Sequence, residues 1–182
     1  MPERLLETIR FPVPQGYGAM LERQLARHKA VVAGEAPNTL FLLEHCPVVT
    51  LGREAHGDNL LLAQAGYDAA GIEVIETSRG GDVTYHGPGQ LVAYPILNLN
   101  EWKLSVGWYL RSLESVLIDL LADYGLVGER VEGMTGVWVG GAKVAAIGVG
   151  LRRWTTFHGI ALNVAPDMAH FKTIIPCGIA DK

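Results

Sequence analysis

The chain has 182 residues, of which 49% are hydrophobic and 19% are charged, and its formal net charge is −4. This length and composition are typical of one folded domain with a substantial buried core, and they exclude an intrinsically disordered chain. The acidic balance and the lack of Lys/Arg-rich tracts argue against nucleic-acid binding, and no apolar run is long enough to predict a membrane span.

The N-terminal sequence MPERLLETIRFPVP carries charges and lacks the apolar core of a signal peptide, so we expect a cytoplasmic protein. Two cysteines, Cys46 and Cys177, lie far apart and form no CxxC pair, which argues against a disulfide framework or a structural zinc site. No HExxH or other compact ligand spacing occurs. We therefore expect no metal.

A helix is predicted near the N-terminus, over residues 17–33, because apolar side chains recur there at helical spacing. The line that they form consists of Leu21, Leu25, His28 and Val32. Charged residues lie off this line, so we expect a surface helix that packs the line against the protein.

Strand and turn signals follow this helix. Residues 39–51 read as strand material that Pro47 interrupts, since proline cannot donate a hydrogen bond to a sheet. A short helix is expected over residues 60–65, and residues 72–77 form the next predicted strand.

The longest helix is predicted from a broad apolar stripe that starts after Ser105 and stops at Gly125. Serine is a favoured N-cap and glycine a favoured terminator, so both ends carry a local signal. The preceding strand, residues 90–97, contains Pro95, which predicts that one side of its end is unpaired. We expect the helix to cover a sheet.

The last part of the chain predicts a hairpin and one more strand. Residues 136–151 read as two strands that turn at Gly140 and Gly141, and residues 157–164 read as the strand that follows. Short connections between strands and few covering helices favour an α+β domain with a mixed, largely antiparallel sheet covered by helices.

The segment RGGDVTYHGPGQLVAYPI, residues 79–96, combines four glycines with aromatic and basic side chains. Glycine lets the main chain come close to a bound group and present its N–H groups. Tyr85 and His86 are predicted to project from the short VTYH strand into the same space, where His86 could move a proton near neutral pH. A glycine-rich hairpin without chemistry is the alternative.

Two further segments accompany this loop. GVWVGGAKVAAIGVGLRRWTTFHGIALNV, residues 136–164, contains Lys143, and FKTIIPCGI, residues 171–179, contains Cys177. In this order, the three segments resemble the lipoyl(octanoyl) transferases, which move an octanoyl group from acyl carrier protein to a lysine of lipoate-dependent enzymes. The resemblance implies a fold that shares its core with biotin and lipoate protein ligases.

Two residues carry the chemistry that the resemblance implies. Cys177 would attack the octanoyl thioester and hold the acyl group, Lys143 would shuttle the proton, and an acceptor lysine would then take the acyl group as an amide. An ammonium beside a thiol favours the reactive thiolate. Without the resemblance, a small buried hydrophobe at Cys177 and a solubilising lysine at Lys143 are the more frequent outcomes.

The substrate site implied by the resemblance has three pieces. They are Arg79, Gly80, Gly81, Asp82, Val83, Thr84, Tyr85 and His86, then Ala146, Ile147 and Gly148, and finally Gly159, Ile160 and Ala161. Small side chains on neighbouring strands would leave an apolar slot for an alkyl chain. Ordinary close packing of small residues is the alternative.

Further histidines and arginines are given expected roles from the sequence around them. His86 is expected to orient Tyr85 or a neighbouring loop rather than to act directly in catalysis, and His158 to do the same, whereas His45 either lies near the site or is a structural histidine. Arg152 and Arg153 are the candidates for docking the acidic carrier protein, with a solvated strand end as the alternative. Backbone N–H groups of the glycine loop or of the Cys177 turn would stabilise the tetrahedral oxyanion.

The resemblance implies octanoyl-acyl carrier protein as the donor and, as acceptors, the lipoyl domains of 2-oxoacid dehydrogenases and the glycine cleavage H protein. The resemblance also implies a monomer. No cofactor is expected, because thioester exchange followed by amide formation needs no nucleotide. The family usually continues past the PCGI segment, so we expect residues 1–182 to be a single catalytic domain that lacks a C-terminal segment. An ATP-dependent lipoate ligase, a cysteine thioesterase and a non-enzymatic binding module stay open as alternatives.

Overall fold

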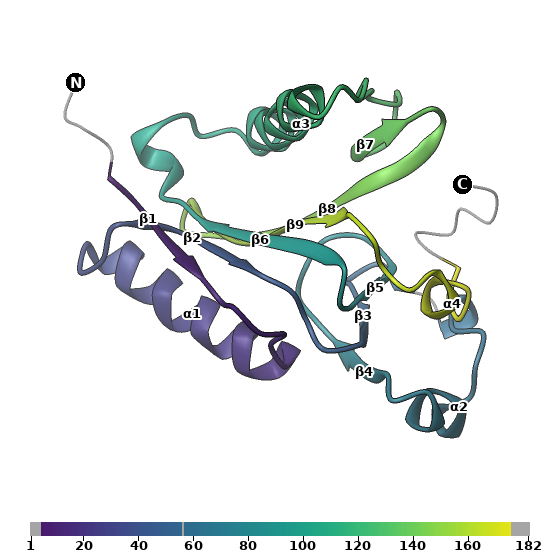
Figure 1. Ribbon diagram of the computed structural model, residues 1–182. Helices are drawn as coiled ribbons and strands as arrows, with labels where there is room; N and C mark the ends of the chain where they lie inside the picture. The colour runs from purple at the N-terminus through teal and green to yellow at the C-terminus, as the bar shows by residue number, and fades with distance from the viewer. Residues whose placement is uncertain (1–4, 56, 176–182) are drawn as a thin grey trace.

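The computed structural model describes residues 5–55 and 57–175, and two sheets form its framework (Figure 1). The larger sheet contains, in spatial order, β1 (Leu6–Arg10), β2 (Asn38–Leu43), β6 (Gln90–Ile96), β9 (Thr155–Asn163), β8 (Ala142–Arg152) and β7 (Gly136–Val139). The smaller sheet contains β4 (Glu73–Glu76), β3 (Val48–Leu51) and β5 (Val83–His86). The β1–β2 and β3–β4 pairs are parallel and the other described pairs are antiparallel, which confirms the predicted sheet class.

Helices cover both faces of the larger sheet. Helix α1 (Tyr17–Ala33) lies on one face and α3 (Val106–Asp123) on the other (Figure 1). The shorter elements are α2 (Gln64–Ala69), α4 (Met168–Phe171) and the 3₁₀ turns η1 (Gly57–Asn59) and η2 (Leu99–Glu101). Among the helices of the described ranges, none combines the length and the apolar character that a bilayer crossing requires.

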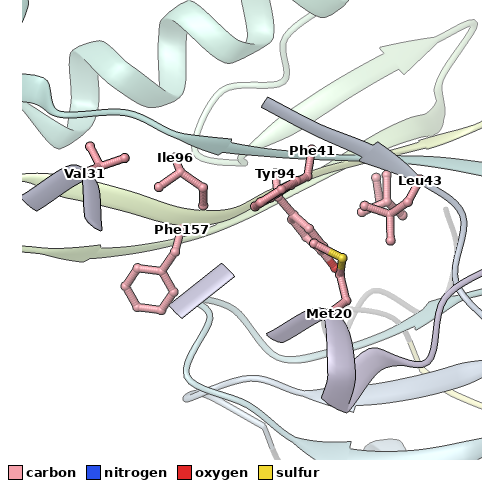
Figure 2. Packing of buried hydrophobic residues seen from close by; sticks show 9 residues of the cluster. Met20, Val31, Phe41, Leu43, Tyr94, Ile96 and Phe157 are labelled. Carbon is pink, nitrogen blue, oxygen red and sulfur yellow. The ribbon is translucent and has the colours of Figure 1, made fainter. Parts of the chain in front are cut away.

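Helix α1 buries a different face from the predicted one. Figure 2 shows its Met20 and Val31 packed with residues of the sheet, whereas Leu25 is 46% exposed. The buried face also carries Gln24, whose Oε1 accepts a hydrogen bond from the His158 N–H at 2.8 Å. The prediction was right for His28, which is buried, but the other three positions of the line are displaced by one from the buried Met20, Gln24 and Val31.

Helix α3 begins and ends where the sequence predicted. The Ser105 hydroxyl accepts a hydrogen bond from the Trp108 N–H at 3.2 Å, and Gly125 has a φ of 73° just after the helix. Leu113 and Leu117 are buried in a cluster that joins α3 to β7, β8 and β9. The predicted cap, stop and covering role are confirmed.

The predicted hairpin and the expected irregularity at Pro95 are also confirmed. Gly140 and Gly141 turn β7 into β8 with φ values of 56° and 84°, which suit a two-residue hairpin turn. The pairing of β6 with β9 stops at Ala93, and the Thr156 hydroxyl then bonds the Pro95 carbonyl at 2.6 Å. A side-chain hydrogen bond at Pro95 thus takes the place of backbone pairing between β6 and β9.

One predicted helix is displaced. Residues 60–65 were expected to be helical, but α2 begins only at Gln64. Leu60 instead forms an isolated bridge with Ile174, and the Leu61 N–H bonds the Thr173 carbonyl at 3.0 Å. The backbone at Leu60 and Leu61 is extended because a distant part of the chain pairs with it.

Candidate active site

A pocket of about 500 Å³ opens where the glycine loop meets β8, β9 and the first turn of α3. This volume is in the range of small-molecule sites. The predicted site residues that line it are Arg79, Gly80, Gly81, Thr84, His86, Lys143, Ala146, Ile147, Gly148, Gly159, Ile160 and Ala161. The structure thus brings Lys143 together with members of all three predicted pieces.

Three predicted residues do not line this pocket: Asp82, Val83 and Tyr85. The Val83 and Tyr85 side chains pack in the core beneath the smaller sheet, where the Tyr85 hydroxyl bonds His170 Nδ1 at 2.8 Å. Successive side chains of a strand point to opposite faces, so the neighbour of His86 on β5 must turn away from it. The expectation that Tyr85 and His86 share one space was wrong.

The predicted nucleophile, Cys177, lies outside the described residues. The other cysteine, Cys46, is free and exposed. Of the two sources proposed for the oxyanion donors, the glycine loop is already partly used, because the Gly80 N–H donates to the Val149 carbonyl at 3.1 Å. That bond ties the loop to β8.

The glycine loop is held by the segment that follows β3. The Arg53 N–H bonds the Arg79 carbonyl and the Glu54 N–H bonds the Gly81 carbonyl, each at 3.1 Å. A Cβ on Gly52 would lie 2.1 Å from the Gly81 carbonyl oxygen, so only glycine permits this approach. The loop is therefore preorganised by its backbone.

Arg79 anchors the start of the loop from inside. Its Nη2 donates to the Thr50 carbonyl at 2.6 Å, and its Nε donates to the Thr50 hydroxyl at 3.0 Å. The side chain is only 7% exposed although it lines the pocket. Its charge therefore acts on the buried groups nearby.

His86 is a neutral hydrogen-bond acceptor toward the pocket. Its Nδ1 lies 2.6 Å from Gln90 Oε1, while the Gln90 amide nitrogen donates to Asn163 Oδ1, so Nδ1 carries the proton and Nε2 keeps a lone pair. Burial, with smaller contributions from His45, Arg79 and other neighbours, lowers the pKa of His86 to about 3. The lowered pKa argues against proton transfer by His86 near neutral pH and leaves the positioning role that the sequence favoured.

A second buried histidine, His45, lies near His86. His45 donates from Nδ1 to the Gln15 carbonyl at 2.9 Å, so its Nε2 accepts from the Tyr94 hydroxyl at 2.7 Å. Burial lowers the pKa of His45 to about 4. Its side chain is fully buried behind Tyr94, which lines the pocket, so His45 acts behind the pocket wall.

His158 lines the pocket in an unusual backbone conformation. Its φ is 56°, a left-handed value that non-glycine residues adopt rarely and mostly at special sites. Its Nε2 lies 3.3 Å from the Ser78 hydroxyl, and burial, followed by the charges of Arg79 and Arg53, lowers its pKa to about 4. The three histidines are thus uncharged at neutral pH.

Lys143 supplies a cation on the β8 side of the pocket. Its side chain is half-buried, and its Nζ lies 5.2 Å from the centre of the Trp138 ring. Within residues 5–55 and 57–175 no carboxylate pairs with it. The same described ranges hold no cluster of His, Cys, Asp and Glu that could bind a metal ion.

The small residues of β8 and β9 have different neighbours. A Cβ on Gly148 would lie 3.0 Å from the Gly80 carbonyl oxygen, so Gly148 makes room for the glycine loop. A Cβ on Gly159 would lie 2.3 Å from the Ala93 carbonyl oxygen, so β6 already requires a glycine there. Close packing therefore accounts for Gly159, whereas Gly148 shapes the pocket.

Several lining residues were not identified from the sequence. They are Tyr17, Arg53, Glu54, Tyr94, Val106, Leu110, Gly133, Met134, Thr135 and Val149. Half of them sit in apolar patterns of helices and strands and the other half in the loops after β3 and before β7, so no local signal distinguishes them. The basic pair Arg152 and Arg153 does not line the pocket and is exposed at the turn between β8 and β9.

Comparison with known proteins shows the family of this chain. The family model described as the lipoyl protein ligase A/B catalytic domain matches residues 17–182. A protein named Octanoyltransferase from Solibacter usitatus is 53% identical over 163 residues, which cover 90% of this chain and 74% of that protein. A protein of the same name from Gloeobacter violaceus is 52% identical over 158 residues, which cover 87% of this chain and 68% of that protein.

Solved structures extend the comparison to the fold. A structure described as a bipartite lipoate protein ligase and its E2 lipoyl domain, from Thermoplasma acidophilum, superposes with a TM-score of 0.71. Its sequence identity is 17%, and the match covers 94% of this chain and 66% of that chain. The fold implied by the sequence resemblance is confirmed.

Proposed function

This chain belongs to the lipoyl protein ligase A/B catalytic domain family, and we propose that it transfers an octanoyl group by way of a thioester on Cys177. It is an acyltransferase of lipoate biosynthesis, because relatives named Octanoyltransferase are 53% and 52% identical to it over most of the chain. The thioester route is our inference for this chain.

One observation carries the proposal. Lys143 lines the same pocket as the glycine loop and the small residues of β8 and β9. The loop offers close backbone approach, the strands offer apolar surface for an alkyl chain, and the lysine offers a proton donor and acceptor. These are the requirements of acyl transfer from a thioester.

The proposed reaction has two steps. In the first, the Cys177 thiolate attacks the carbonyl carbon of the octanoyl thioester, and the carrier thiol leaves with a proton from Lys143. In the second, the amine of an acceptor lysine attacks the enzyme thioester, the C–S bond breaks, and Lys143 takes the proton that the new amide loses. The Cys177 thiolate is regenerated, so atoms and charges balance without a further reactant.

The acyl donor and the acceptor proteins are inferred from the relatives and from the family resemblance. Lipoyl domains are the acceptors, in keeping with the octanoyltransferase relatives and with the structure of a lipoate ligase and its E2 lipoyl domain. We propose octanoyl-acyl carrier protein as the donor, and the lipoyl domains of 2-oxoacid dehydrogenases and the glycine cleavage H protein as the specific acceptors. We further propose that residues 1–182 form a single catalytic domain that acts as a cytoplasmic monomer.

Intact-protein mass spectrometry tests the thioester route. The wild-type protein is mixed briefly with octanoyl-acyl carrier protein, beside Cys177→Ala, Lys143→Ala and the control Cys46→Ala. We expect an octanoyl adduct on the wild type and on the exposed-cysteine control, none without Cys177, and slow formation without Lys143. Addition of a lipoyl domain should move the adduct onto that domain.

Other outcomes identify other functions. An adduct that disappears without modifying the lipoyl domain would indicate a thioesterase. Modification of the lipoyl domain by free octanoate and ATP, with no adduct on Cys177, would indicate a ligase. An adduct that forms equally well in Cys177→Ala would contradict the proposed nucleophile.

A further inference from the structure

The side chain of Lys143 lies against two residues of β7, Gly136 and Trp138. Lys143 pairs in register with Trp138, and its Nζ lies 5.2 Å from the centre of the Trp138 ring. A Cβ on Gly136 would lie 2.7 Å from Lys143 Cε, so the lysine stem occupies the space that a larger residue would fill. One residue thus leaves room for the stem and the other contacts the ammonium.

The indole of Trp138 is fixed by its surroundings. The side chain is 1% exposed. Its backbone N–H and carbonyl both bond Glu129, at 2.9 and 2.8 Å, while β8 pairs on the other side of the strand. The backbone of Trp138 is thus held on both sides, and burial of the side chain restricts the ring.

The orientation of this ring leaves one of its own groups unpaired. In the described part of the chain, the buried Trp138 Nε1 has no hydrogen-bond partner. Buried indole N–H groups usually find one, and leaving a buried donor unpaired is unfavourable. The packing therefore fixes the ring face without help from its polar edge.

The ammonium of Lys143 has few competing interactions. Across residues 5–55 and 57–175 it takes part in no salt bridge, and it makes a cation–π contact with the face of Trp138. A carboxylate partner would tie the charged form into an ion pair that has to break at each proton transfer. An aromatic face attracts the ammonium by its quadrupole and also packs against the neutral amine. It can hold the nitrogen in place in both protonation states.

We propose that Trp138 is a positioning residue for acyl transfer, and that its indole face and the gap at Gly136 hold the Lys143 nitrogen at the pocket wall. The inference rests on the proposed role of Lys143. Glu114 supports the arrangement from behind, since its Oε1 accepts the Gly136 N–H at 3.3 Å. Proton transfer to and from the reacting sulfur and amine then starts from one fixed geometry.

The test compares Trp138→Phe and Trp138→Leu with the control Trp108→Leu. Trp108 packs against the same apolar cluster from α3, but it does not line the pocket, and the cation–π contact of Lys143 is with Trp138 instead. We expect Trp138→Leu to lower kcat about tenfold with little change in KM for octanoyl-acyl carrier protein, since loss of one cation–π contact to a positioned ammonium has about this magnitude. Phenylalanine keeps an aromatic face and should restore part of the rate. The control should keep its kcat once the rate is corrected for the folded fraction.

A second variant pair separates positioning from general damage. In the Lys143→Ala background, Trp138→Leu should cause no further loss, because residues that act through one another are not additive. An additional tenfold loss there, or an unchanged kcat in the single variant, would overturn the proposal.

Chemical labelling checks the contact without relying on turnover. Acetylation of Lys143 by an amine-reactive ester, measured by peptide mass spectrometry relative to the exposed Lys29, should rise at least about threefold in Trp138→Leu and stay unchanged in Trp108→Leu. Equal labelling in all proteins would contradict the contact. If Lys143→Ala transfers octanoyl normally, the proposed function of the lysine fails, whereas the labelling result still decides whether Trp138 holds it.

Discussion

Two buried polar regions of this protein solve the same physical problem in opposite ways. Behind β7, the carboxylate of Glu114 is 1% exposed and ion-paired: Arg111 and Arg130 donate to its Oε2 at 2.7 and 2.9 Å, and the Gly136 N–H donates to its Oε1. In the pocket region, His86 and His158 are 6% and 1% exposed and have lost their charge.

The difference shows what each region is for. A buried charge is tolerated only when its partners satisfy it, and a fully satisfied group has no capacity left for a ligand. A neutral imidazole can stay buried with one nitrogen bonded and the other free to accept a hydrogen bond. The Glu114 centre therefore holds elements together, whereas the pocket histidines keep an open position.

A change of pH should change the free energy of unfolding more than any variant below. It tests whether the histidines of the pocket region are held neutral. The pKa values of His45 and His158 are lowered to about 4 and that of His86 to about 3. Unfolded histidine protonates near pH 6.5, so protonation below this pH favours the unfolded chain. Stability is highest above about pH 6.5 and is lost between there and pH 3–4, at about 1.4 kcal/mol per pH unit for each histidine.

Urea unfolding at pH 7, 6 and 5 measures this slope. His86→Asn keeps a donor for Gln90 but cannot titrate, so it should reduce the slope by about 1.4 kcal/mol per pH unit below pH 6.5. A wild-type stability that stays flat from pH 7 to 5 would mean that these histidines are not held neutral.

Glu114→Gln tests the charged half of the comparison. It should lower the free energy of unfolding by about 2 kcal/mol, because hydrogen bonds to charged groups contribute about 1.5–3 kcal/mol and the two arginines remain partly solvated. Urea unfolding at pH 7 provides the measurement. Glu22→Gln on the exposed side of α1 is the matched control and should change stability by less than about 0.5 kcal/mol. Equal effects at both positions would remove the distinction between the two regions.

Two glycines of β8 allow a similar comparison within one strand, because Gly150 packs against the core and Gly148 lies at the pocket. A Cβ on Gly150 would lie 2.5 Å from the Phe157 ring, so Gly150→Ala should destabilise the protein by about 1–2 kcal/mol through overpacking and leave transfer by the folded enzyme intact. A Cβ on Gly148 meets the glycine loop instead. Gly148→Ala should therefore lower transfer roughly tenfold or more with a smaller loss of stability, because small misplacements of a site are costly.

Thermal unfolding and octanoyl transfer, measured on the same preparations, check both glycine variants. The contrast is lost if the two variants reduce activity and stability in the same proportion.

Ser105 connects the two regions, since α3 carries Glu114 on its buried side and Val106 at the pocket. Ser105→Ala should lower stability by about 1 kcal/mol through loss of the N-cap, and Ser105→Asn should retain most of it. Thermal unfolding would show the difference, and a neutral alanine variant would indicate that the cap contributes nothing to α3.

The sequence by itself determined the elements that depend on neighbouring residues. The ends of α3 follow from Ser105 and Gly125, and the turn of the hairpin follows from Gly140 and Gly141, because caps and tight turns are local interactions. The three signature segments also identified the family and most residues of the pocket. The nucleophile, Cys177, remains a prediction from the sequence.

Only the tertiary structure decided which side chains meet. The periodicity of α1 could not show that Gln24 would be buried against His158, which lies 134 residues further along the chain. Nor could the VTYH segment show that β5 sends His86 to the pocket and Tyr85 to the opposite core. Burial also lowers the pKa of His86, and burial depends on neighbours that are distant in the sequence, which no local pattern shows.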